Sequence, residues 1–97
     1  MTIQEKVGKT IIKLRKERGM SQETFAYESG IDRRYMSDIE NGKRNISLDI
    51  LERVADKLGI KLSEFFLEVI SVYYHFRGHT KMIAFAKEFT VKLNILC

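Results

Sequence analysis

Residues 22–41 constrain the fold of this chain more than any other segment. Two runs with the apolar spacing of short α-helices are separated here by Gly30. Glycine adopts the left-handed backbone of a tight turn without steric cost, and Ala26 is small enough to let a second helix approach closely. Larger apolar residues fall on the inner side of this corner, namely Phe25, Ile31, Met36 and Ile39. The segment therefore predicts two helices that cross steeply around a short turn.

The outward face of the second of these helices is polar and basic. Asp32 is a favourable N-cap, but Arg33 and Arg34 follow it directly, and a cation in the first turn of a helix is disfavoured by about 0.3–1 kcal/mol. Local preferences are often broken where a residue has a function. Arginines at the start of a helix in the major groove contact guanine edges or phosphates. The pattern predicts a helix-turn-helix that reads DNA bases through Arg33, Arg34, Ser37 and Asp38.

Length and composition indicate one small globular domain. The chain has 97 residues, of which 44% are hydrophobic and 31% charged. It has no apolar run long enough to span a membrane and no charged-then-apolar leader, so we expect a cytoplasmic protein. Its single cysteine, Cys97, cannot form an internal disulfide, which agrees with a reducing compartment.

The sequence offers little for catalysis or metal binding. It contains no phosphate-binding loop, no HExxH motif and no nucleophile with a plausible base, so we expect neither an enzyme nor a cofactor. His75 and His79 have a spacing that could hold a metal on a helix. Gly78 lies between them and argues against a regular helix, so no metal site is predicted.

Charge is distributed unevenly along the chain. Residues 1–46 contain ten Lys or Arg against seven Asp or Glu, which gives this segment a net charge of +3. Residues 47–69 have a net charge of −2, and residues 70–97 return to +3. Because phosphates attract cations, the first segment is expected to carry the DNA-binding surface and the acidic segment to face away from DNA.

Capping residues and apolar spacing predict an all-α fold of five helices. The first begins near Ile3, the others follow the caps Ser21, Asp32, Ser47 and Ser63, and the first four end at Gly19, Gly30, Gly42 and Gly59. The apolar stripe of the fourth helix is expected to contain Leu48, Leu51, Val54, Ala55 and Leu58. We expect residues 1–70 to form the helix-turn-helix domain and residues 71–97 a C-terminal extension.

The extension has two competing patterns. Thr80 could cap a helix over residues 81–88, after which residues 89–95 alternate apolar and polar as in a half-buried strand. Met82, Ala86, Phe89, Leu93 and Leu96 also lie on a helical stripe, and a continuing helix is slightly favoured. In either form the segment has enough apolar surface to pack on the fifth helix or across a dimer.

Residues 5–69, and the run DRRYMSDIENGKRNIS in particular, resemble Xre-type helix-turn-helix regulators of the lambdoid repressor class, and especially the controller proteins of restriction-modification systems. The resemblance covers about two thirds of the chain. It implies a compact five-helix domain whose third helix enters the major groove. It also implies a homodimer that binds a pseudo-palindromic operator in double-stranded DNA.

The resemblance assigns further contacts to matching positions. Gln22 corresponds to a glutamine that anchors a phosphate, and Tyr35 to an aromatic that lies against the DNA backbone and thymine methyls. Lys43, Arg44 and Asn45 form the loop that would clamp the sugar-phosphate chain, called the 43–45 loop below. An arginine of the first helix would also approach the backbone, and Arg15 or Arg18 could fill this role.

Some of these residues have structural alternatives. Tyr35 could pack between the first and third helices, and Asp38 could orient an arginine rather than accept from cytosine. The resemblance implies that Glu40 pairs with a cation of the first or second helix. Asn41 is expected to end the third helix rather than to touch DNA.

Two functions fit these features. The first is a homodimeric transcription regulator of its own gene and of restriction-modification or phage-type genes. The second is an antitoxin-like regulator whose tail binds a partner protein. The predicted dimer interface lies on the fifth helix and comprises Phe65, Phe66, Val69, Ile70 and Tyr73.

Overall fold

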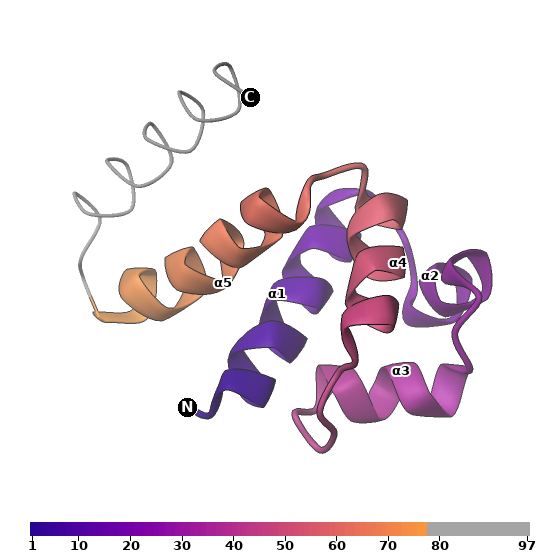
Figure 1. Cartoon of the computed structure of the whole chain (residues 1–97), viewed down its shortest axis with the longest axis horizontal. Helices are drawn as coiled ribbons and strands as arrows, with labels where there is room; N and C mark the ends of the chain where they lie inside the picture. Colours follow the sequence, from indigo (N-terminus) through magenta and orange to yellow (C-terminus); the bar gives the residue numbers. More distant parts are fainter. Residues whose placement is uncertain (78–97) are drawn as a thin grey trace.

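The computed structural model describes the backbone of residues 1–77 and the side chains of residues 1–71. These residues form five helices and no strands: α1 (Ile3–Glu17), α2 (Gln22–Ser29), α3 (Arg33–Glu40), α4 (Leu48–Leu58) and α5 (Leu62–Arg77). The prediction of an all-α, five-helix domain is confirmed. Figure 1 shows α1 between α5 on one side and the α2–α3 pair on the other, and α1 contacts each of the other four helices.

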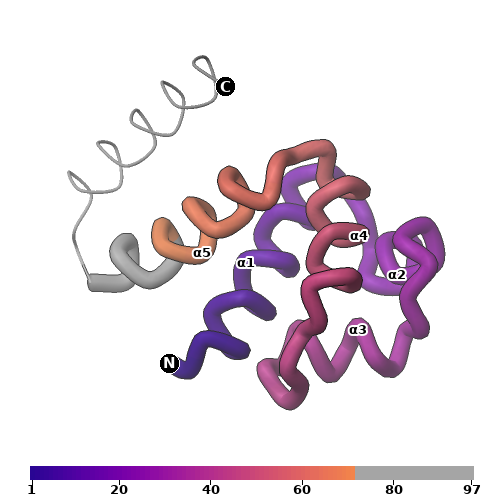
Figure 2. The backbone as a smooth tube through the Cα atoms, viewed as in Figure 1, coloured from indigo at the N-terminus to yellow at the C-terminus, as the bar shows by residue number. Residues whose placement is uncertain are grey.

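Local side-chain chemistry sets most of the helix ends. The hydroxyls of Ser21 and Ser47 accept hydrogen bonds from the backbone of Thr24 and Ile50 at 3.1 and 3.2 Å, as predicted for N-caps. Short loops join the helices, as the trace in Figure 2 shows. Gly30 closes α2 with φ of 69°, a conformation that glycine adopts without strain.

The start of α5 differs from the prediction by two residues. Glu64 accepts a hydrogen bond from the backbone N–H of Lys61 at 3.2 Å. Lys61 therefore precedes the first turn, and α5 begins at Leu62, so Ser63 lies inside the helix rather than at its cap.

The core lies where the five helices meet. Phe25, Met36 and Ile39 from the corner of α2 and α3 are fully buried, as predicted, and Ile31 is nearly so. The prediction for Leu48 is wrong, because its side chain is 79% exposed. Leu48 is the first residue of α4 and lies beyond the edge of the core, so the buried stripe of this helix starts one turn later at Leu51, followed by Val54, Ala55 and Leu58.

Helices α1 and α3 approach closely at Gly8. A β-carbon at this position would lie 2.5 Å from the backbone oxygen of Glu40 and 2.6 Å from that of Ile39. A side chain here would push the helices apart. Gly8 therefore sets the distance between the central helix and the helix expected to enter the DNA groove.

The described part of α5 continues to Arg77, so the boundary predicted at residue 70 falls within a helix. The predictions for residues 78–97, including the helix after Thr80 and the alternatives that follow it, lie outside the described residues. So do the side chains of Tyr73 and His75. Within the part of the chain that the structure describes, no helix is both long and apolar enough to cross a membrane.

Candidate nucleic-acid interface

The start of α3 is held through its backbone. The carboxylate of Asp32 accepts hydrogen bonds from the backbone N–H groups of Arg34 and Tyr35 at 3.1 and 3.3 Å. This confirms Asp32 as the N-cap. Because the cap uses backbone groups, the side chains of Arg33 and Arg34 remain exposed at the first turn, as a groove-reading helix requires.

Arg33 lies beside an acidic residue of α2. Its guanidinium is 3.6 Å from the carboxylate of Glu23, and both side chains are largely exposed. An ion pair this accessible to water contributes little to stability. It does place a negative charge next to one of the two arginines predicted to read bases.

Arg44 of the 43–45 loop contacts two residues of α3. Its Nε lies 3.6 Å from the carboxylate of Asp38, and its guanidinium carbon lies 5.1 Å from the centre of the Tyr35 ring. Tyr35 is half-buried and also packs against the core. The contact between Asp38 and Arg44 agrees with the alternative in which Asp38 orients an arginine. The half-buried position of Tyr35 agrees with the alternative in which its ring packs between helices. The Arg44 side chain is still 57% exposed.

The remaining predicted contacts lie near the end of α3. Ser37 is half-buried, and its hydroxyl accepts a long hydrogen bond of 3.5 Å from the side chain of Asn41, whose backbone N–H also caps the helix. The prediction that Asn41 ends this helix is confirmed. Lys43 is exposed, while the side-chain oxygen of Asn45 accepts a hydrogen bond from Gln4 at the start of α1.

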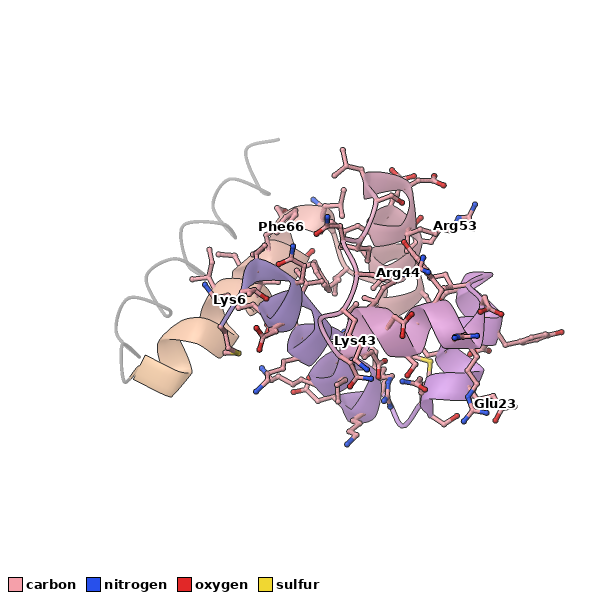
Figure 3. All side chains as sticks on the ribbon, turned by 90° about the horizontal axis from the view of Figure 1, so that it is seen from below. Lys6, Glu23, Lys43, Arg44, Arg53 and Phe66 are labelled. Atoms are coloured by element: carbon pink, nitrogen blue, oxygen red, sulfur yellow. The ribbon has the colours of Figure 1, made fainter. Side chains whose placement is uncertain are left out.

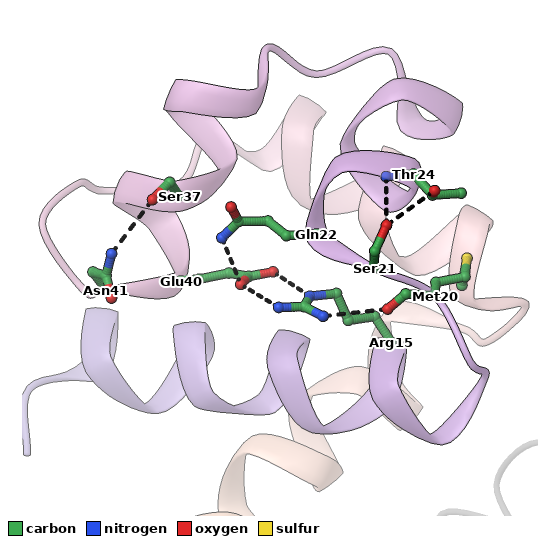
Figure 4. Close-up of polar contacts among 8 residues, drawn as sticks. All are labelled: Arg15, Met20, Ser21, Gln22, Thr24, Ser37, Glu40 and Asn41. Atoms are coloured by element: carbon green, nitrogen blue, oxygen red, sulfur yellow. Dashed lines mark hydrogen bonds and ion pairs between the residues drawn. The ribbon is translucent and has the colours of Figure 1, made fainter.

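A buried ion pair joins α1 to α3, as Figure 4 shows. Arg15 donates from Nε and Nη2 to the two carboxylate oxygens of Glu40 at 2.7 and 2.9 Å, and from Nη1 to the backbone oxygen of Met20 at 3.2 Å. The side chains of Arg15 and Glu40 are only 10% and 2% exposed. Pairing of Glu40 with a first-helix cation is confirmed. The assignment of Arg15 to the DNA backbone is wrong, because its side chain is almost completely buried and three of its five N–H donors bind groups inside the protein.

The same carboxylate also holds Gln22. The side-chain amide of Gln22 donates to Glu40 at 2.9 Å, which fixes its orientation at the first residue of α2. An amide nitrogen has two N–H donors, so one remains for a ligand such as a phosphate.

The hydrogen bonds that Arg15 donates to Glu40 raise the pKa of Arg15 above its usual range, against the opposing effect of burial.

Arg18, the alternative to Arg15, is also engaged within the protein. Its guanidinium donates to the backbone oxygens of Leu58 and Leu14 at 2.9 and 3.0 Å. Arg15 thus joins α1 to α3, and Arg18, the residue that follows α1, joins the end of α1 to α4.

The set predicted for the dimer interface divides into two groups. Phe65 and Val69 are buried in the core of the chain, so they cannot contact a second copy, and this part of the prediction is wrong. Phe66 and Ile70 are 43% and 40% exposed and remain available. Consecutive residues of an α-helix lie about 100° apart around its axis, so Phe65 and Val69 can meet the core while Phe66 and Ile70 remain exposed.

Figure 3 shows how the charged residues lie along α3. Arg44 and Lys43 lie near one end of the helix and Glu23 near the other, while Phe66 lies away from this surface on α5. Sequence reasoning did not find Glu23 or Gln4 as neighbours of the predicted contacts. Glu23 follows Gln22 at the start of α2, and this adjacency is the signal that could have indicated it.

The comparisons with known proteins agree with this geometry. Residues 11–65 match the family HTH_3, described as helix-turn-helix. The control protein C.MunI of a Mycoplasma species is 50% identical over 68 residues, which cover 69% of this chain and 92% of that protein. The crystal structure of the restriction-modification controller protein C.AhdI of Aeromonas hydrophila is 40% identical, with a TM-score of 0.62 over 64% of this chain and 94% of that one.

A further solved structure contains DNA. It is the tetramer of the restriction-modification controller protein C.Esp1396I in complex with its natural 35 base-pair operator, which is 38% identical with a TM-score of 0.67. The match covers 73% of this chain and 93% of that one. The chain therefore belongs to the HTH_3 helix-turn-helix family and is a transcriptional regulator homologous to the controller proteins of restriction-modification systems.

Proposed function

We propose that this chain binds an operator in double-stranded DNA as a homodimer and controls its own gene together with restriction-modification or phage-type genes. The observation that carries the proposal is the exposed Arg33–Arg34 pair on a backbone-capped helix start, with Arg44 presented from the adjacent loop. The operator complex of C.Esp1396I supports the same role for a homologue.

The contacts divide between reading bases and holding the backbone. Arg33 and Arg34 read bases, since bidentate contacts from arginine to guanine supply about 1–3 kcal/mol of discrimination each. Ser37 and Asp38 take part in reading at the next turn of α3. Gln22, Tyr35 and the 43–45 loop hold the sugar-phosphate chain, which sets the register of α3 in the groove.

A homodimer follows from the size of the module. The chain presents one recognition helix, so tight and specific binding requires two copies on half-sites about 34 Å apart or a multiple of this distance. Among the members of the predicted interface whose side chains the structure describes, Phe66 and Ile70 are exposed. The proposed dimer should be observed by sedimentation at micromolar concentration, on and off DNA.

The homologues favour this function over the antitoxin-like alternative. The relatives described above are controller proteins of restriction-modification systems. The proposal therefore includes no partner protein for the tail.

Binding-site selection tests the proposal. The unmodified chain should select a two-fold symmetric sequence, and Arg33→Ala should relax the preference at one base pair in each half-site while retaining the rest. Arg53→Ala is the matched control, because Arg53 is an exposed arginine on α4 rather than α3. Selection of no common sequence by the unmodified chain would refute the function, and an unchanged preference in Arg33→Ala would refute the role of Arg33.

A further inference from the structure

The lysines of α1 form two pairs on different faces of the helix. Lys6 and Lys13 are seven residues, or about two turns, apart and share one face, as do Lys9 and Lys16. The ammonium of Lys13 lies 3.1 Å from the carboxylate of Glu68, so the first pair lies on the side of α5. Lys9 and Lys16 are exposed. We call Lys9 and Lys16 together the α1 row.

The α1 row borders the contact between α1 and α3. This contact includes Gly8, which approaches the backbone of α3, and Arg15, which pairs with Glu40. Lys9 follows Gly8 and Lys16 follows Arg15, so each lysine lies about 100° around α1 from the contact. The α1 row therefore flanks the line along which α1 meets α3.

The turn that ends α3 lies on the same side of α1 as the row. A β-carbon on Gly42 would lie 2.7 Å from Cγ of Glu5. Glu5 precedes Lys9 by four residues, so both lie on one face of α1. Lys43 follows Gly42 and is exposed, and Figure 3 shows it where the end of α3 meets α1. The α1 row thus continues the basic surface of Lys43 along α1.

Arg44 lies on the other side of α3. It is beside Asp38, whereas Glu40, two residues later and hence about 160° around the helix, faces α1. Gln22, for which a phosphate contact is proposed, binds Glu40 and so lies on the α1 side. A helix in the major groove has a phosphate strand on each side, so α3 has cations available to both strands.

We propose that Lys9 and Lys16 bind phosphates of the DNA strand that borders α3 on the α1 side, opposite the strand held by Arg44. This contact depends on the proposed function, because it requires α3 in the major groove. The two lysines are about 10 Å apart along α1, whereas phosphates recur about every 3.4 Å of the duplex axis on each strand. Each lysine therefore meets a different phosphate.

Charge and side-chain chemistry favour DNA as the ligand of the α1 row. A lysine ammonium is a point charge on a flexible stem, so it binds phosphate without the fixed geometry of an arginine fork. Contacts of this kind add affinity without sequence preference, and base reading stays with α3. DNA is favoured over an acidic protein, because a duplex seated on α3 already brings its phosphates to this side of α1.

Salt titrations test the contact. The unmodified chain and the double variant Lys9→Gln/Lys16→Gln are titrated with the selected operator and with random-sequence duplex. The double variant should bind both DNAs more weakly by the same factor, and the slope of log affinity against log salt should fall by about one for each lysine. Lys9→Arg/Lys16→Arg should keep the slope, because it keeps the charge. Lys13→Gln is the matched control on the same helix, since Lys13 is held by Glu68.

An unchanged slope in the double variant would overturn the proposal. An equal reduction in Lys13→Gln would also overturn it, because the slope would then follow the net charge of the chain rather than a local contact. Random-sequence duplex separates this test from operator recognition. Selection of no common sequence would refute the proposed function, while the slope on random-sequence duplex would still report on the α1 row.

Hydroxyl-radical footprinting on the operator locates the contact. The double variant should lose protection on one strand of each half-site and Arg44→Ala on the other strand, because the two sets of cations flank α3 on opposite sides. Loss of protection at the same sugars in both variants would refute the placement of the α1 row on the second strand.

Discussion

The guanidinium of Arg15 and the carboxylate of Glu40 form two parallel hydrogen bonds, of 2.7 and 2.9 Å, across the contact between α1 and α3. Bidentate pairing of this kind fixes orientation as well as distance. The carboxylate also orients the amide of Gln22 at the start of α2. One acidic side chain therefore joins the central helix to both helices of the proposed DNA-binding unit.

Removal of the Glu40 carboxylate should destabilise the folded protein. Glu40→Ala leaves the buried charge of Arg15 without a partner, which destabilises a protein by roughly 3–5 kcal/mol. The matched control is Glu28→Ala, which removes a half-exposed partner of Lys57 at 3.5 Å and should cost about 1 kcal/mol or less. Urea denaturation of the two variants measures the difference. Equal losses would contradict a structural role for the Arg15–Glu40 pair.

Arg44 should act on affinity rather than on sequence preference. Arg44→Ala is expected to weaken binding to all DNA sequences similarly and to reduce the slope of log affinity against log salt by about one. Arg44→Lys should restore the slope but not the full affinity, because lysine lacks the planar group that lies over Tyr35 beside Asp38. Titrations at several salt concentrations check this. A changed base preference with an unchanged slope would contradict it.

Glu23 should limit binding to unrelated sequences. Its carboxylate lies 3.6 Å from Arg33 and repels phosphates that would approach this arginine without a matching base. Glu23→Gln is therefore expected to raise affinity for random DNA more than affinity for the operator. Glu28→Gln, at the other end of α2, is the control. Competition titrations give the ratio of the two affinities, and a ratio that stays constant in Glu23→Gln would refute this role.

The stability that the capping interactions at the start of α1 contribute should depend on pH. Glu5 accepts hydrogen bonds from the backbone and hydroxyl of Thr2 at 3.2 and 3.0 Å, and these bonds hold the pKa of Glu5 below its ordinary value of 4.5. Because the folded pKa is the lower one, the contribution to stability is complete above the ordinary pKa and is lost as pH falls through the folded pKa.

Glu5→Ala should accordingly cost most at neutral pH, and the difference from the unmodified chain should shrink below pH 4.5. Gln4→Ala removes a neutral side chain from the same turn, so its effect should not vary with pH. Urea denaturation at several pH values distinguishes the two. A Glu5→Ala effect that stays constant would contradict the assignment.

Features that depend on a few neighbouring residues could be predicted from the sequence. The caps Ser21, Asp32 and Ser47 each bind backbone groups two or three residues ahead, so a local pattern is sufficient to identify them. The inner residues of the α2–α3 corner are similarly determined by helical spacing around Gly30.

Features that depend on contacts between distant segments could not be predicted in this way. Arg15 and Arg18 are equivalent in the sequence, and only the approach of Glu40, 25 residues away, explains why Arg15 is buried. Similarly, α5 is apolar on more than one side, so the pattern does not reveal that Phe65 meets the core while Phe66 faces outward. Leu48 shows the same limit, because the edge of the core is set by packing between helices.

The Asp32 cap separates the stability of α3 from the identity of its outward side chains. It binds the backbone of Arg34 and Tyr35, and the Arg33 and Arg34 side chains contribute nothing to the core. Under the proposed base-reading role, substitutions at positions 33 and 34 would therefore change which DNA sequence is preferred with little cost to folding. A regulator built in this way can acquire a new operator over evolutionary time by single replacements, while the same five-helix scaffold is retained.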